Sequence, residues 1–114
     1  MTLVTGAHVM IFTRDEEADR AFLRDVLEIP NIDAGGGWLI FKLPPAELGV
    51  HGGENNDVHE LYLMTDNLDA AIATLAGKGV ACPEPYNASW GRATSVPLPG
   101  GGKIGLYEPR HARP

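Results

Sequence analysis

The sequence predicts an α+β domain made of two similar halves. Two observations predict this fold class. An apolar stretch followed by an amphipathic helical pattern occurs near the start of the 114 residues and again after the midpoint, which indicates an internal repeat. The 14 glycines and 9 prolines are many for a chain of this length, so tight turns between several short strands are expected. A chain of this size suits one domain and can bury about two-thirds of its unfolded surface.

The first half begins with the apolar strand 9–12 and continues into a helix predicted at 17–27. Asp15 can cap the start of this helix, and Pro30 ends it. The helical pattern rests on apolar residues that recur at steps of three and four, namely Ala18, Ala21, Phe22 and Val26. Three short strands are expected after the helix, at 30–34, 37–43 and 46–51.

The second half repeats this order of elements. The apolar strand 61–64 precedes a helix that the segment 65–67 can cap and that Gly77 ends. Its apolar residues have the same spacing and are Leu68, Ala71, Ile72 and Leu75. Three strands are expected at 80–84, 90–98 and 103–108. The glycine clusters 35–37 and 100–102 lie between strands, which favours hairpin turns over phosphate-binding loops.

The polar, glycine-bearing segment 52–57 lies between the two halves and is expected to link them. We therefore predict one domain spanning residues 1–114, with modules at about 6–52 and 58–109. Within this domain, the first and last strands of each module place alternate side chains on opposite faces of the sheet. One of these faces is expected to pack under the helices, and it carries Val9, Ile11, Leu61 and Leu63.

Composition excludes several functional classes. Lys and Arg number 9 against 15 Asp and Glu, and the net charge of −6 argues against a nucleic-acid-binding protein. No apolar run approaches the roughly 18 residues of a membrane span, and the first residues lack the pattern of a secretory signal. Cys82 is the single cysteine and has no internal disulfide partner. We therefore expect a cytoplasmic protein that binds neither nucleic acid nor membrane.

The sheet face away from the helices lacks the charged surface of a solvated sheet. It carries apolar and aromatic side chains with a few polar groups, which is the composition of a ligand cavity; a second core or a dimer interface is the alternative. The predicted members of this face are His8, Met10, Phe12, His51, Glu60, Tyr62, Met64 and Tyr107. Tyr86 and Trp90 belong to a polar, loop-like segment and are further candidates for binding the ligand.

Several segments give this arrangement a family resemblance. The segment HVMIF at 8–12 leads to Asp15 and to AFLRDVL at 21–27, NLDAA lies at 67–71, and GKIGLYEP lies at 102–109. In this order and spacing they resemble the vicinal oxygen chelate superfamily, which shares the glyoxalase, bleomycin-resistance and extradiol-dioxygenase fold. The resemblance implies two βαβββ modules that form a curved mixed sheet around a cavity. It implies no single activity, because this fold is used by lyases, isomerases, dioxygenases and metal-free drug-binding proteins.

The resemblance also implies four positions for metal ligands. His8 and Glu60 occupy two of them, whereas Gly49 and Gly105 stand where the family has glutamate. Two protein ligands hold a first-row metal weakly, because functional sites usually have three or more. His51, two residues beyond Gly49, would complete a set of two histidines and one carboxylate if the strand shifted its register or formed a bulge. The simpler alternative is that His8 and Glu60 form a buried hydrogen-bonded pair.

The resulting hypothesis is a small-molecule-binding protein without a full metal site and without another cofactor. A homodimer is expected, because an open sheet leaves strand edges that need cover. The alternative is a metal-dependent lyase, isomerase or dioxygenase that binds a divalent ion and uses His8 and Glu60 as catalytic residues, with His51 as a third ligand. Metal content and turnover of a substrate distinguish the two hypotheses.

Overall fold

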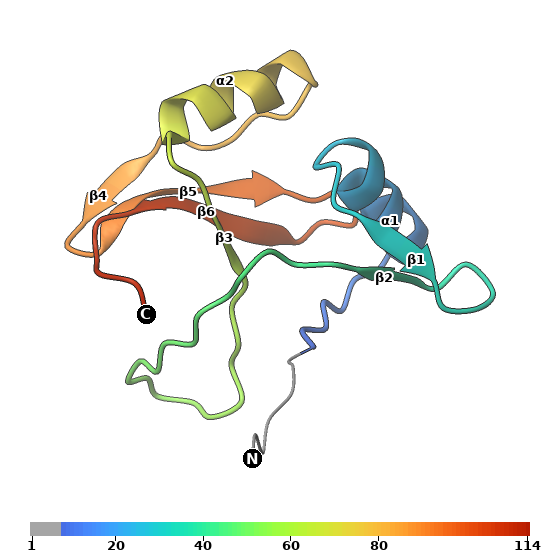
Figure 1. The fold of residues 1–114 in the computed structure, drawn as a ribbon, viewed down its shortest axis with the longest axis horizontal. Helices are drawn as coiled ribbons and strands as arrows, with labels where there is room; N and C mark the ends of the chain where they lie inside the picture. Colours follow the sequence, from blue (N-terminus) through green and yellow to red (C-terminus); the bar gives the residue numbers. More distant parts are fainter. Residues whose placement is uncertain (1–7) are drawn as a thin grey trace.

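The computed structural model describes residues 8–114 and confirms the α+β class (Figure 1). The elements are, in chain order, α1 (Glu16–Asp25), β1 (Asn31–Asp33), β2 (Leu39–Phe41), β3 (Tyr62–Met64), α2 (Leu68–Gly77), β4 (Tyr86–Ala88), β5 (Gly91–Pro97) and β6 (Lys103–Pro109). The start of the first predicted module, and the residues on which the signal-sequence prediction rests, lie outside the described residues. Within the described residues, neither helix is long and apolar enough to cross a membrane.

Both helices begin where the sequence places their caps. The Asp15 carboxylate accepts a hydrogen bond from the backbone N–H of Ala18 at 3.1 Å, and the Asn67 side chain accepts one from Ala70 at 3.0 Å. These contacts satisfy N–H groups that have no partner within the helix itself. The local sequence therefore determines where each helix starts.

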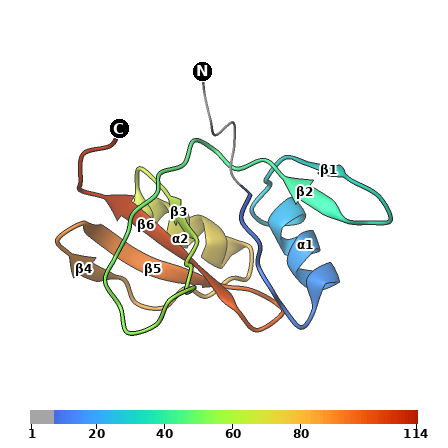
Figure 2. The same ribbon diagram turned by 90° about the horizontal axis from the view of Figure 1, so that it is seen from below.

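The four-stranded sheet forms the centre of the molecule. Its strand order is β3-β6-β5-β4, in which β3 and β6 run parallel and the other pairs are antiparallel. The α2 helix lies on one side of this sheet, and the long segment between β2 and β3 passes on the other side (Figure 1). Strands β1 and β2 form a separate antiparallel pair next to α1 (Figure 2).

The hydrophobic core lies between the four-stranded sheet and the helices. Alternation along β5 and β6 sends every second side chain toward the helices. The buried cluster comprises Phe22, Leu68, Leu75, Val80, Val96, Leu98, Ile104 and Leu106. Leu61 and Leu63, which the alternation predicts on the helix side, pack against this cluster. The opposite face of the sheet does not pack against the helices.

A buried carboxylate joins α1 to the turn between β5 and β6. Asp19 is only 5% exposed, and its Oδ1 atom accepts the backbone N–H of Gly100 at 2.7 Å. A Cβ atom at position 100 would overlap Thr13 Oγ1 and would lie 2.9 Å from both carboxylate oxygens of Asp19, so glycine is required here. This contact attaches the first half of the chain to the second.

Three expected strands are not formed. Segments 9–12 and 46–51 are irregular, because within the described residues no backbone hydrogen bond joins either of them to a neighbouring strand. The segment 80–84 is also not a strand: a proline within it and another just after it cannot donate ladder hydrogen bonds, so pairing with β5 starts only at β4. The strands of the two halves consequently form separate sheets, whereas the resemblance implies one curved sheet.

Candidate functional site

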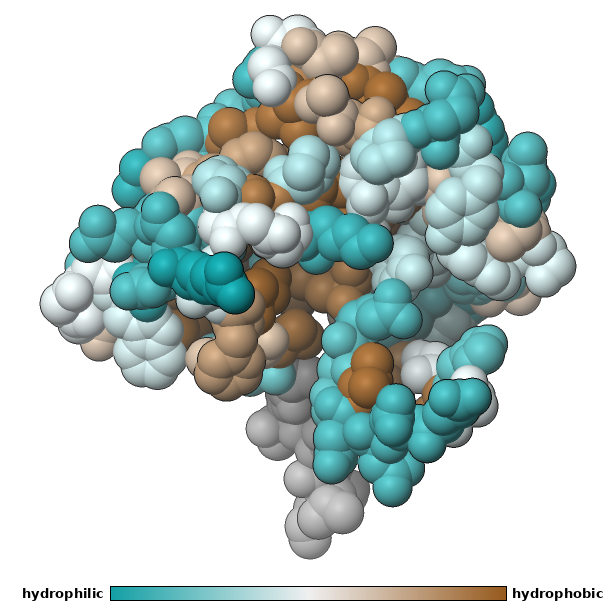
Figure 3. Space-filling model, turned by 180° about the vertical axis from the view of Figure 1, so that it is seen from behind, coloured by the Kyte–Doolittle hydropathy of each residue, from teal (hydrophilic) through white to brown (hydrophobic). Residues whose placement is uncertain are grey.

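A cavity of about 590 Å³ opens between the segment 9–12 and strands β3, β5 and β6. Residues just before β3, together with Pro83, Glu84 and Tyr86, complete its wall. Figure 3 shows hydrophobic side chains at the bottom of a hollow on this side of the molecule. Small-molecule sites have volumes of about 300–1,000 Å³, so the cavity has the size that a drug-like or metabolite-like ligand needs.

The ring of Tyr62 lies against β6 at the centre of the sheet. Tyr62 pairs with Gly105, which in turn pairs with Ser95 on β5. A Cβ atom at position 105 would lie 2.7 Å from Tyr62 Cγ and closer still to two other ring atoms. The missing side chain at position 105 therefore does not leave an empty space for a ligand, because the ring of Tyr62 fills that space.

Four aromatic side chains meet beside the cavity and are called the aromatic cluster: Tyr62, Tyr86, Trp90 and Tyr107. The ring centroid of Trp90 lies 6.1, 6.4 and 5.3 Å from those of the three tyrosines, and the rings are nearly perpendicular. Such edge-to-face packing is favourable and leaves parts of the ring faces free. Tyr86 is 51% exposed and Trp90 is 37% exposed, so the cluster presents open aromatic surface.

Carboxylates outnumber the fixed positive charges of the cavity wall. Asp57, Glu60 and Glu84 line it, and among the described lining residues Lys103 is the one lysine or arginine. The Tyr62 hydroxyl donates a hydrogen bond to Glu60 Oε2 at 3.2 Å. Partial burial, and then the negative charge of Glu60, raise the pKa of Tyr62 above its ordinary value. The phenol therefore stays protonated and able to donate.

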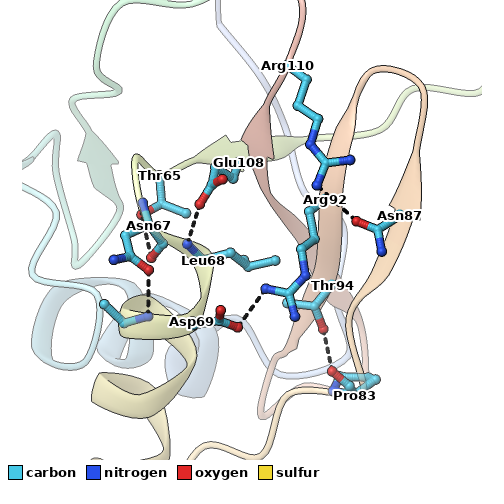
Figure 4. Close-up of polar contacts among 11 residues, drawn as sticks. Thr65, Asn67, Leu68, Asp69, Pro83, Asn87, Arg92, Thr94, Glu108 and Arg110 are labelled. Atoms are coloured by element: carbon cyan, nitrogen blue, oxygen red, sulfur yellow. Dashed lines mark hydrogen bonds and ion pairs between the residues drawn. The ribbon is translucent and has the colours of Figure 1, made fainter.

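Polar contacts hold α2 against the strands that form the wall (Figure 4). Glu108 on β6 accepts the backbone N–H of Leu68, the first residue of α2, at 3.0 Å. Arg92 on β5 donates to Asp69 in the first turn of α2 at 2.6 Å. Both contacts cross from the sheet to the N-terminus of α2 and fix the helix relative to β5 and β6.

The structure brings part of the predicted site together. Five predicted residues line the cavity, namely Met10, Phe12, Glu60, Tyr62 and Tyr86. Trp90 and Tyr107 adjoin it through the aromatic cluster. Met64 on β3 is not among the lining residues, and neither are His8 and His51, which are both exposed.

Some lining residues differ from those that strand alternation predicts. Val9 and Ile11 are predicted to face the helices but line the cavity, because the segment 9–12 is not a strand and alternation does not apply to it. His59 and Leu61 line the cavity together with Glu60 for the same reason, since β3 begins only after these residues. No local signal in the sequence shows that these stretches are irregular.

The residues that the resemblance assigns to a metal do not form a three-ligand group in the described part of the chain. Within residues 8–114, no three His, Cys, Asp or Glu side chains lie close enough together to hold a metal ion. His51 Nδ1 instead lies at hydrogen-bonding distance from the carbonyl oxygen of Gly52. The expected burial of His8 with Glu60 is not observed either, since both side chains are exposed. In this arrangement the implied donors do not fit a metal.

The fold is shared with several solved structures, although no family model and no curated protein matches the sequence. TnmS3, an antibiotic binding protein from Streptomyces sp. CB03234, superposes with a TM-score of 0.65 at 22% identity, covering 96% of this chain and 99% of its own. A glyoxalase/bleomycin resistance protein/dioxygenase superfamily member from Sphaerobacter thermophilus DSM 20745 gives a TM-score of 0.66 at 23% identity, covering 94% and 99%.

Lactoylglutathione lyase from Agrobacterium tumefaciens is also similar, with a TM-score of 0.65 at 13% identity over 94% of this chain and 96% of its own. These proteins share the fold that the sequence motifs resemble. The chain therefore has the glyoxalase/bleomycin resistance/dioxygenase fold, and the predicted resemblance is confirmed at that level. Identities below 25% establish the fold alone, because one fold serves many functions.

Proposed function

We propose that this protein binds a small organic molecule in the cavity beside β3, β5 and β6, in the cytoplasm and without metal chemistry. The observation that carries the proposal is the composition of the wall, which combines the apolar segment 9–12, open aromatic rings and a few polar groups such as Glu60. A binding role is supported by the fold that the chain shares with an antibiotic binding protein.

Binding would use both sides of the cavity. The ligand's apolar part would cover Phe12, which is 90% exposed; burying such a side chain contributes about 1.5–3 kcal/mol. Its polar group would meet Glu60 and the Tyr62 hydroxyl, which are already joined by a hydrogen bond. Within the described residues, the segment 9–12 has no backbone hydrogen bonds to a strand, so it can adjust to the ligand's shape.

A fragment screen on the variant Trp38→Phe tests this proposal, because the chain has 2 tryptophans and Trp90 then becomes the single reporter. A binder should change the Trp90 emission and raise the unfolding temperature. Phe12→Ala should weaken the binding by at least about tenfold. The matched control is Ile32→Ala, an exposed apolar residue outside the cavity, which should leave affinity unchanged. A screen without any binder, or equal effects of the two variants, would refute the proposal.

We also propose that the protein is a homodimer. Leu48 and Val50 alternate in an irregular segment and are 92% and 96% exposed, and β3 lies at the edge of its sheet. Association of two copies would cover this apolar surface and the strand edge. Light scattering at micromolar concentration should therefore give twice the chain mass of 12.2 kDa. The double variant Leu48→Asp, Val50→Asp should give the mass of one chain, and a monomeric wild type would rule out the dimer.

A further inference from the structure

We infer that the ligand is an organic cation, meaning a protonated amine or quaternary ammonium group carried on an apolar or aromatic body; this inference rests on the proposed function. Two independent features of the cavity support it. The first is the set of aromatic ring faces beside the cavity, and the second is the excess of carboxylates over positive side chains in its wall.

The aromatic rings provide a surface that attracts positive charge. Tyr62 and Tyr86 line the cavity, and the ring of Trp90 packs against both of them, with centroids 6.1 and 6.4 Å away. The rings meet at angles of 79° and 86°, so their faces point in more than one direction. A cation within about 6 Å of such a face is attracted by the negative potential of the ring, most strongly for tryptophan. Apolar residues alone would not give this preference.

The carboxylates add a charge preference in the same place. The Tyr62 hydroxyl donates a hydrogen bond to Glu60 Oε2 at 3.2 Å and holds this carboxylate beside the rings. A cation over the ring face therefore lies close to a negatively charged group. Asp57 and Glu84 line the same cavity, whose fixed positive charge among the described lining residues is Lys103. His111 stacks on Tyr107, a ring of the cluster that does not line the cavity. An anionic ligand would therefore meet net repulsion.

Three probes that share one phenethyl group test the inference, namely phenethylamine, 2-phenylethanol and 3-phenylpropanoate. Isothermal titration calorimetry at pH 7 and low salt should rank them amine, alcohol, carboxylate, with at least about a tenfold difference in affinity between the first and the last. Raising the salt from about 0.1 M to 1 M shortens the Debye length from about 10 Å to 3 Å and should reduce this ratio. The alcohol should be insensitive to salt.

Variants of the site separate charge from packing. Glu60→Gln should weaken the amine about three- to tenfold and leave the alcohol unchanged, whereas Glu54→Gln, an exposed carboxylate outside the cavity, should change neither. Tyr86→Leu should weaken the amine more than the alcohol, because it removes a ring face but keeps an apolar side chain. Tyr86→Phe keeps the ring and should restore amine binding.

The outcomes distinguish this inference from the proposed function. Equal affinity for the three probes would overturn the cation preference, while the cavity would still be a small-molecule site. Failure of all three to bind at millimolar concentration would also overturn it, and the fragment screen on Trp38→Phe would decide the proposed function separately. An amine preference that Glu60→Gln and Tyr86→Leu both reduce would support the inference.

Discussion

The substitution Gly105→Ala tests whether the Tyr62 ring occupies the space beside β6. The added Cβ atom would lie 2.7 Å from Tyr62 Cγ, so the ring must move. Overpacking costs about 1–3 kcal/mol. A ring that swings away instead loses edge-to-face contacts with Trp90 and Tyr107, worth about 0.5–1.5 kcal/mol each. The reduced entropy of the unfolded chain offsets about 0.4–1 kcal/mol of either cost. We expect the free energy of unfolding to fall by about 1–2 kcal/mol.

Urea denaturation at one fixed protein concentration measures this change, with Gly102→Ala as the matched control because its Cβ atom would meet open space. The control should lie within about 0.5 kcal/mol of the wild type. In a Tyr62→Ala background the cost of Gly105→Ala should disappear, since the clashing ring is gone. The reasoning is refuted if Gly105→Ala is as stable as the control, or if its cost persists without the Tyr62 ring.

The variant Asp19→Ala should lower the free energy of unfolding, measured in urea, by about 1–3 kcal/mol, because the Gly100 N–H loses its acceptor. The control Glu54→Ala, at an exposed position, should leave the free energy of unfolding unchanged, and equal effects of the two variants would contradict the role of this contact. Burial raises the pKa of the Cys82 thiol, so iodoacetamide should alkylate it more slowly at pH 8 in the folded protein than in the urea-unfolded chain. The folded protein therefore keeps the thiol proton to higher pH than the unfolded chain does, so the free energy of unfolding should decrease as the pH rises above the pKa of the unfolded thiol. Equal alkylation rates would argue against the raised pKa and against this pH dependence. Elemental analysis should find no stoichiometric first-row metal, because the implied ligands do not form a group of three within residues 8–114. One equivalent of metal that His51→Ala removes would restore the three-ligand hypothesis and favour an enzyme.

Local signals in the sequence are sufficient for the starts of the helices and for the side of the sheet on which Tyr62 lies. Asp15 and Asn67 satisfy the first N–H groups of their helices, a contact that depends only on residues a few positions away. Alternation also predicts Tyr62 on the face opposite Leu63, because β3 and β6 are regular strands in which neighbouring side chains point to opposite faces.

The remaining wall depends on contacts that no local pattern encodes. The apolar run 9–12 and the alternating segment 46–51 are both typical of strands, but such a sequence becomes a strand only when a neighbour accepts and donates its backbone hydrogen bonds. That neighbour is determined by tertiary or quaternary structure. Glycine at position 105 was equally ambiguous, since a missing side chain marks either an empty site or a space that another residue fills, and Tyr62 fills it.

The position of β6 has a consequence for biosynthesis. This strand is the last element in the sequence, yet it lies inside the sheet between β3 and β5. A nascent chain that lacks β6 holds β3 without its hydrogen-bonding neighbour, while the hairpin of β4 and β5 can form earlier because its strands are adjacent. The sheet is therefore completed only after β6 has been translated, and a chain cut before Lys103 lacks the strand that joins β3 to β5.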